Sequence, residues 1–188
     1  INKQLKVFED VCRNIDVLFK IAKPNKRLIL CVDGVAPQGK SKQQKQRRFK
    51  SSLESNKPAE FDPNSISVGT KFMDHLTKYI DWYIKKKIND DPDWKNIEVI
   101  FSNEKSRGEG EHKIIKYIKT NCNPNESFCI SGLDSDLIML TLGTFLEKFL
   151  VLRNDFNSVD TYHYIDIGGV RTKLIEFMKW DQTGKPYK

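Results

Sequence analysis

The sequence predicts an α/β protein with a mostly parallel central sheet flanked by helices. Short apolar runs such as "RLILCVD" and "IEVIFS" have the length and residue types of buried strands. They alternate with longer segments in which apolar residues recur every three or four positions, as in amphipathic helices. Strands that alternate with helices along a chain favour parallel pairing. At 188 residues the chain is long enough for one domain with a proper core, and we expect residues 1–188 to form it.

The first half of the chain contains two amphipathic helices and two strands. Pro24 ends the first helix, and a polar, basic helical stretch follows the first strand. Residues 54–69 carry two prolines and many turn formers, so we expect a loop there. In chain order the expected elements are helix 4–22, strand 27–33, the basic helix 38–53, helix 70–89 and strand 97–102.

The second half continues the alternation with shorter elements. Apolar residues at helical spacing follow the loop "SRGEGE", and β-favouring runs follow each helical segment. The expected elements are helix 112–119, strand 128–132, helix 135–142, strand 148–153, a further strand 161–166 and a final helix from about 167 to 180.

Five acidic residues fall at the ends of the first three predicted strands. They are Asp33, Glu109, Glu111, Asp134 and Asp136. Ligands of open α/β sheets gather at the carboxyl ends of the strands, so we expect these side chains to converge. So many neighbouring negative charges repel one another without cations, and oxygen ligands in this number favour Mg²⁺ or Mn²⁺. Such clusters are typical of phosphodiester hydrolysis assisted by two divalent ions.

Each acidic motif also has a structural explanation. Asp33 could be a turn residue, and "GEGE" could be a solvated loop. The motif "DSD" could cap the helix that follows it. Their coincidence at three strand ends favours the metal site. Two other D-x-D chemistries, haloacid-dehalogenase-type phosphatases and sugar-nucleotide transferases, leave Glu109 and Glu111 unexplained. His112 is a further candidate for a hydrogen bond to the site.

Residues 34–56 form a basic segment that begins with "GVAPQGKS", a match to the phosphate-loop pattern G-x-x-x-x-G-K-[ST]. No apolar stripe follows until Phe49, and Pro37 lacks one of the amides that such a loop uses. On a helix, four side chains of this segment share one face, with spacings i, i+4, i+7 and i+8. They are Lys40, Gln44, Arg47 and Arg48. This face suits a terminal phosphate group; the alternative is a solvated basic surface.

Charge and composition narrow the choice of partner and compartment. The net charge is +7, from 32 basic and 25 acidic residues, and this excess favours a polyanion, most simply nucleic acid. No apolar run reaches the roughly 18 residues of a membrane span, so we expect no membrane partner. The four cysteines show no C-x-x-C spacing. We therefore expect an intracellular protein, cytoplasmic or nuclear.

Five stretches resemble, in order and wording, the core of the XRN family of 5′-to-3′ exoribonucleases. They are "VDGVAPQGKSKQQKQRRFKSS", "FDPNSISVGTKFM", "DPDWKNIEVIFS", "GEGEHKIIKYI" and "CISGLDSDLIMLTL". The resemblance implies a PIN- and flap-endonuclease-like fold, RNA with a 5′-monophosphate as substrate, release of nucleoside monophosphates, and dependence on Mg²⁺. Carried over by position, it implies metal ligands at Asp33, Glu109, Glu111, Asp134 and Asp136. It also implies a 5′-phosphate pocket formed by Lys40, Gln44, Arg47 and Arg48.

The sequence departs from the family pattern in four places, one of which is a linker between Leu53 and Phe61 that is shorter than expected. Nothing in it matches the preceding family segment with a further metal-binding Asp, so we expect either a longer protein or an incomplete metal site. Asp155 in "RNDF" imitates a later family motif but falls earlier in the order, and Arg107 stands where a proline is usual. The alternative to an enzyme is therefore a non-catalytic RNA-binding relative with an incomplete metal site.

Overall fold

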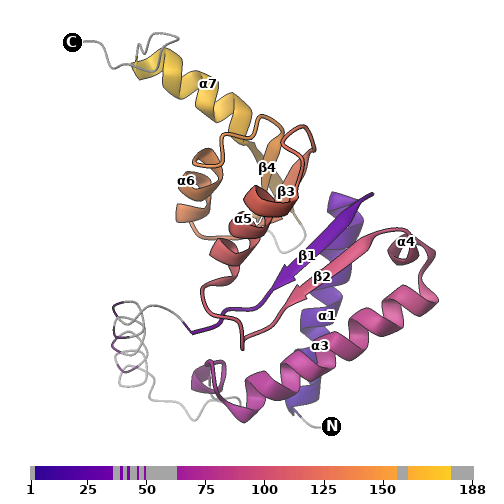
Figure 1. Ribbon diagram of the computed structural model, residues 1–188. Coiled ribbons are helices and arrows are strands. Elements are labelled where there is room, and N and C mark those ends of the chain that lie inside the picture. Colours follow the sequence, from indigo (N-terminus) through magenta and orange to yellow (C-terminus); the bar gives the residue numbers. More distant parts are fainter. Residues whose placement is uncertain are drawn as a thin grey trace. The chain divides into compact units, whose positions relative to one another are not determined.

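The computed structural model in Figure 1 describes residues 3–35, 63–155 and 161–178, together with the single positions Gly39, Lys42, Gln46 and Phe49. These residues form an α/β structure, as the sequence predicts, in two compact units, residues 1–114 and 115–188. Two of the described strand pairs are parallel and one is antiparallel. Among the described helices, none has both the length and the hydropathy needed to cross a lipid bilayer.

The first unit is built on a parallel pair of strands, β1 (Arg27–Cys31) and β2 (Glu98–Ser102). Helices α1 (Lys3–Ala22) and α3 (Lys71–Asp90) accompany this pair in Figure 1. Their apolar faces form one core with the strand residues Leu30 and Phe101. The two predicted amphipathic helices are therefore confirmed. Their apolar residues recur at helical spacing because one face of each helix packs into this shared core.

Aromatic rings close the core of the first unit. Phe19 of α1 stacks on Trp94 with ring centroids 4.8 Å apart, and Tyr83 of α3 meets the same indole edge-on at 6.0 Å. Trp94 is fully buried. It lies on the short helix α4 (Pro92–Lys95). This helix forms because Asp91 accepts a hydrogen bond from the Asp93 amide at 3.1 Å and Pro92 needs no partner for an N–H at the first helical position.

The second unit contains a three-stranded sheet in the order β3-β4-β5, with β3 at Phe128–Ser131, β4 at Phe149–Asn154 and β5 at Tyr162–Asp166. Helix α5 (Gly110–Asn121) leads from the first unit into the second, which also contains α6 (Asp136–Leu142) and α7 (Ile167–Met178). The central strand β4 contributes core residues to this unit, since its Phe149 and Val151 are fully buried.

The described strands form two sheets, whereas the sequence predicted one central sheet. Apolar runs specify that strands form, but they do not specify which edges pair. The strand β5 runs antiparallel to β4 because the connection at 155–161 is too short for the crossover that parallel strands require. Short parallel pairs and an antiparallel edge strand are thus the observed form of the predicted α/β class.

Candidate metal centre

The two strands of the first unit end at the same edge of their sheet. Cys31 lies opposite Ser102 in the parallel register, and the Val32 amide donates a hydrogen bond to the Ser102 carbonyl at 2.9 Å. Asp33 follows directly on one strand, and the loop at 103–109 follows on the other. The parallel register therefore brings the first two predicted acidic motifs to one edge.

Backbone contacts join the two loops that leave this edge. The Gly34 amide donates to the Gly108 carbonyl at 2.9 Å, and the Gly108 amide donates to the Val35 carbonyl at 3.1 Å. Gly108 has φ of +98°, a conformation that favours glycine. Gly34 lies so close to Ser106 that a Cβ at position 34 would stand 1.7 Å from the Ser106 carbonyl oxygen. The first glycine of the phosphate-loop match therefore has a packing role, for which the sequence held no signal.

A side-chain hydrogen bond links Asp33 to the glutamate pair. The Gly110 amide donates to Asp33 Oδ1 at 2.6 Å, and Gly110 is the residue between Glu109 and Glu111. Asp33 is exposed, while the side chains of Glu109 and Glu111 retain only 12% and 17% of their accessible surface. Three of the five predicted carboxylates thus belong to one small region of the first unit.

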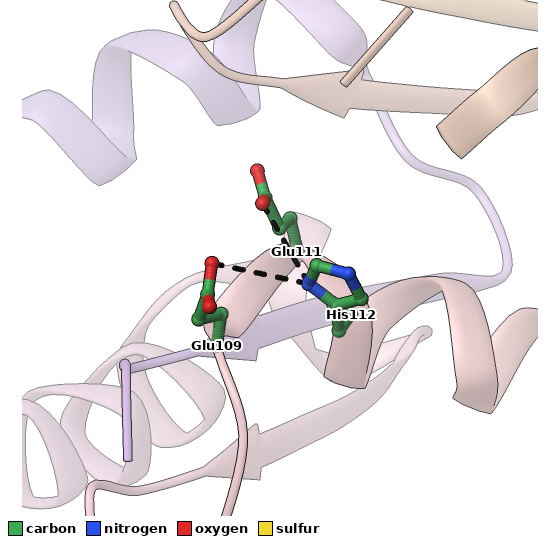
Figure 2. Close-up of side chains that lie close together, drawn as sticks. All are labelled: Glu109, Glu111 and His112. Carbon is green, nitrogen blue, oxygen red and sulfur yellow. Dashed lines mark ion pairs between the residues drawn. The ribbon is translucent and has the colours of Figure 1, made fainter. Parts of the chain in front are cut away.

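His112 extends the glutamate pair, as Figure 2 shows. Its Nδ1 atom lies 3.6 Å from Glu111 Oε1 and 4.0 Å from Glu109 Oε2. Both distances lie within ion-pair range for a protonated imidazole, and both are longer than a hydrogen bond. Ligand atoms of Glu109, Glu111 and His112 all lie within 4.8 Å of one another.

The donor set of this region suits a hard divalent cation. Carboxylate oxygens are the preferred ligands of Mg²⁺ and Mn²⁺, and an imidazole nitrogen is also acceptable to Mn²⁺ or other first-row metals. Two largely buried carboxylates in the same small cluster repel one another, and a bound cation relieves that repulsion. Glu111 lies in the first turn of helix α5, where the free amides of the helix N-terminus stabilise a negative charge.

The remaining two predicted ligands lie in the second unit. Asp134 follows β3 and Asp136 is the first residue of α6, and both are exposed. The helix N-cap is Ser135, whose side chain makes no capping hydrogen bond, so neither aspartate occupies the cap position. Arg153 of β4 donates a hydrogen bond to the Leu133 carbonyl and ties this loop to the sheet. The convergence of all five carboxylates stays a prediction.

The predicted phosphate pocket lies outside the described residues. Lys40, Gln44, Arg47 and Arg48 all fall within the basic segment 34–56, most of which the structure does not describe. The described positions Lys42, Gln46 and Phe49 are helical and exposed. A shared helical face for the four phosphate-binding candidates therefore stays a prediction.

Comparison with known proteins gives consistent matches. Residues 1–155 match the family model described as "XRN 5′-3′ exonuclease N-terminus". The chain is 40% identical over 171 residues to a chicken (Gallus gallus) protein named 5′-3′ exoribonuclease 2, covering 76% of this chain and 18% of the relative. It is 40% identical over 169 residues to 5′-3′ exoribonuclease 1 of Saccharomyces cerevisiae and 38% identical over 189 residues to the human protein of that name. These two matches cover 80% and 90% of this chain, but only 11% of each relative.

Proposed function

Because the chain belongs to the XRN 5′-3′ exonuclease family, we propose that it acts in a Mg²⁺-dependent 5′-to-3′ exoribonuclease that degrades 5′-monophosphorylated RNA to nucleoside monophosphates. The family assignment confirms the resemblance found in the sequence. The chain spans less than a fifth of the curated relatives described above, so the activity of a whole relative is carried to it as a proposal. Its setting inside the cell, cytoplasmic or nuclear, is part of the same proposal.

One observation carries the proposal, the hydrogen bond from the Gly110 amide to Asp33 Oδ1. It links residues 77 positions apart and brings Asp33 to the peptide between Glu109 and Glu111. Acidic side chains from different crossovers that meet at strand ends are expected of a metal-dependent hydrolase. A solvated "GEGE" loop would give no reason for this contact or for the low exposure of both glutamates.

We expect Mg²⁺, or Mn²⁺ in its place, to be held by Asp33, Glu109 and Glu111 together with Asp134 and Asp136. When bound, divalent ions supply a water of lowered pKa and a positive charge beside the leaving oxygen of the phosphodiester. The carboxylates would hold these ions at the carboxyl ends of the strands.

We also propose that the basic segment selects the RNA end. Lys40, Gln44, Arg47 and Arg48 would bind the 5′-monophosphate, with arginine forks on its oxygens and the lysine as a point charge. Because this segment leaves the same strand end as Asp33, a bound phosphate would lie near the metal site and fix the first phosphodiester against it.

For the fold, we propose that both units together complete a PIN- and flap-endonuclease-like nuclease core over residues 1–188. Parallel pairing of β1 with β2 and of β3 with β4 supports this proposal, as does the position of an acidic motif after each of β1, β2 and β3. Such a core would bring Asp134 and Asp136 to the glutamate pair.

The second candidate function is RNA binding without hydrolysis. It is the alternative that the sequence leaves open, a relative whose metal site is incomplete. The five acidic residues weigh against it, because largely buried carboxylates such as Glu109 and Glu111 would only destabilise the site without a cation.

The test compares full-length protein with Glu109→Gln and Asp134→Asn, using 5′-monophosphorylated RNA and Mg²⁺. Each variant keeps the side-chain shape and removes one ligand charge, so we expect hydrolysis to fall on the order of a hundredfold or more while RNA binding is retained. Wild-type binding without Mg²⁺-dependent hydrolysis would support the non-catalytic alternative. Full activity in either variant would reject that residue as a ligand.

A further inference from the structure

The loop between β2 and α5 contains a buried carboxylate that the proposed chemistry does not use. Glu104 is only 4% exposed, although it stands in the polar stretch "SNEKSRGEGE". The hydroxyl of Thr77, a buried residue of α3, donates a hydrogen bond to Glu104 Oε2. Burying a carboxylate is costly unless its charge is paired and hydrogen-bonded, so this contact constrains where the loop can lie.

A second anchor comes from the other side of the loop. The Lys113 ammonium donates to the Asn103 carbonyl at 2.9 Å and reaches the Ser102 and Ser106 carbonyls at 3.5 Å each. Burial lowers the pKa of Lys113, while the Asp33 and Glu104 carboxylates oppose this effect. The lysine therefore contacts the loop at both its start and its middle and lies close to the Glu104 charge.

These anchors lie on either side of the glutamate pair along the chain. Glu104 precedes Glu109 by five residues, and Lys113 follows Glu111 by two. Between them, Ser106 lies directly against Gly34, which leaves the loop little freedom at that point. A loop that is fixed at Glu104 and Ser106, and again just beyond it at Lys113, presents the two proposed metal ligands in one geometry.

We propose that Glu104, held by Thr77, and Lys113 are positioning residues that fix the loop at 103–109 and so set the geometry of Glu109 and Glu111. The inference rests on the proposed function only for the role of these glutamates. None of the three positioning residues contacts substrate or reacting atoms in this scheme. They act through the backbone of the loop.

The experiment measures amide hydrogen exchange of residues 103–110 in full-length protein. Thr77→Val removes the donor hydroxyl and leaves the Glu104 carboxylate buried, so exchange across the loop should quicken on the order of tenfold. Thr77→Ser restores a hydroxyl and should restore protection. Ile80→Val, one turn further along α3 and also buried, controls for a general loss of packing. Lys113→Met provides a second route to the same release if Thr77→Val fails to fold.

A second readout connects the loop to the metal site. In Thr77→Val, the Mg²⁺ concentration for half-maximal RNA cleavage should rise severalfold, with the preference for 5′-phosphorylated RNA unchanged. Loop exchange equal to that of Ile80→Val, or an unchanged Mg²⁺ requirement, would overturn the inference. If wild-type protein neither binds Mg²⁺ nor cleaves RNA, the proposed function fails, and the exchange comparison alone then decides whether Glu104 and Thr77 hold the loop.

Discussion

Replacing Gly34 by alanine tests whether the close approach of the two loops holds the candidate site together. A Cβ at position 34 would stand 1.7 Å from the Ser106 oxygen and 2.8 Å from its carbonyl carbon. Contacts of a real Cβ below 3.0 Å are essentially never seen, so the backbones must separate by about 1.3 Å. Such a shift strains or breaks the hydrogen bonds that join Gly34 and Val35 to Gly108.

The cost of this substitution follows from two effects. Forcing an extra methyl group into a packed site costs roughly 1–3 kcal/mol. Each lost backbone hydrogen bond adds about 1 kcal/mol. We therefore expect Gly34→Ala to lower the free energy of unfolding by about 3 kcal/mol, a large part of the roughly 5–15 kcal/mol that a domain has. Misplacing the glutamate loop by about 1 Å should also slow hydrolysis by about a hundredfold.

Urea unfolding of the full-length protein, followed by circular dichroism, measures the change in the free energy of unfolding. Gly39→Ala is the matched control, because Gly39 is helical and a Cβ there meets nothing within 4 Å. Alanine at position 39 should leave stability unchanged or raise it by up to about 1 kcal/mol. Equal unfolding free energies for the two alanine variants would refute the argument that Gly34 is required for a close approach.

Three further predictions address the core, the thiols and the RNA end. Trp94→Ala should lower the free energy of unfolding by roughly 3–5 kcal/mol, because the indole is fully buried. Trp82→Ala, at a half-exposed position, should lower it by less than about 1 kcal/mol. Thermal denaturation measures both, and similar losses for the two variants would contradict the assignment of Trp94 to the core. Burial raises the pKa of Cys12 to about 11, with a further contribution from Asp16. At pH 8 the native thiol should therefore react with iodoacetamide at least about a hundredfold more slowly than the thiol of protein unfolded in urea. Mass spectrometry measures both rates, and equal rates would show that the thiol is not protected. Arg48→Ala should reduce the preference for 5′-monophosphorylated over 5′-hydroxyl RNA on the order of tenfold, and an unchanged ratio would remove Arg48 from the proposed pocket.

The secondary structure was largely predictable because its signals are local. Apolar spacing predicted helices at 4–22 and 70–89, and the structure has them at Lys3–Ala22 and Lys71–Asp90. The Thr70 hydroxyl, which accepts a hydrogen bond from the Met73 amide, fixes the start of the second helix. The strand predicted at 27–33 is shorter, ending at Cys31, because Val32 and Asp33 already belong to the connection that leaves the sheet.

The candidate site was predictable in residue type and in part of its arrangement. The acidic motifs at the ends of two apolar runs indicated that Asp33, Glu109 and Glu111 belong together, and the hydrogen bond to Asp33 is consistent with that. No local signal distinguishes Glu104, because a glutamate among Asn, Lys and Ser resembles any solvated loop residue. Its burial depends on Thr77, which stands 27 positions earlier on another helix.

The sequence alone determined the α/β class, the family and the chemical types of the proposed site residues. Periodicity and motif spacing depend only on residues that are close together in the chain. The tertiary structure decided which strands pair, which glycine must lack a side chain, and which carboxylate is removed from water. These outcomes depend on contacts between residues far apart in the chain, such as Gly34 with Ser106 and Thr77 with Glu104. Desolvation and close packing act on those contacts, and no single stretch of sequence contains both partners.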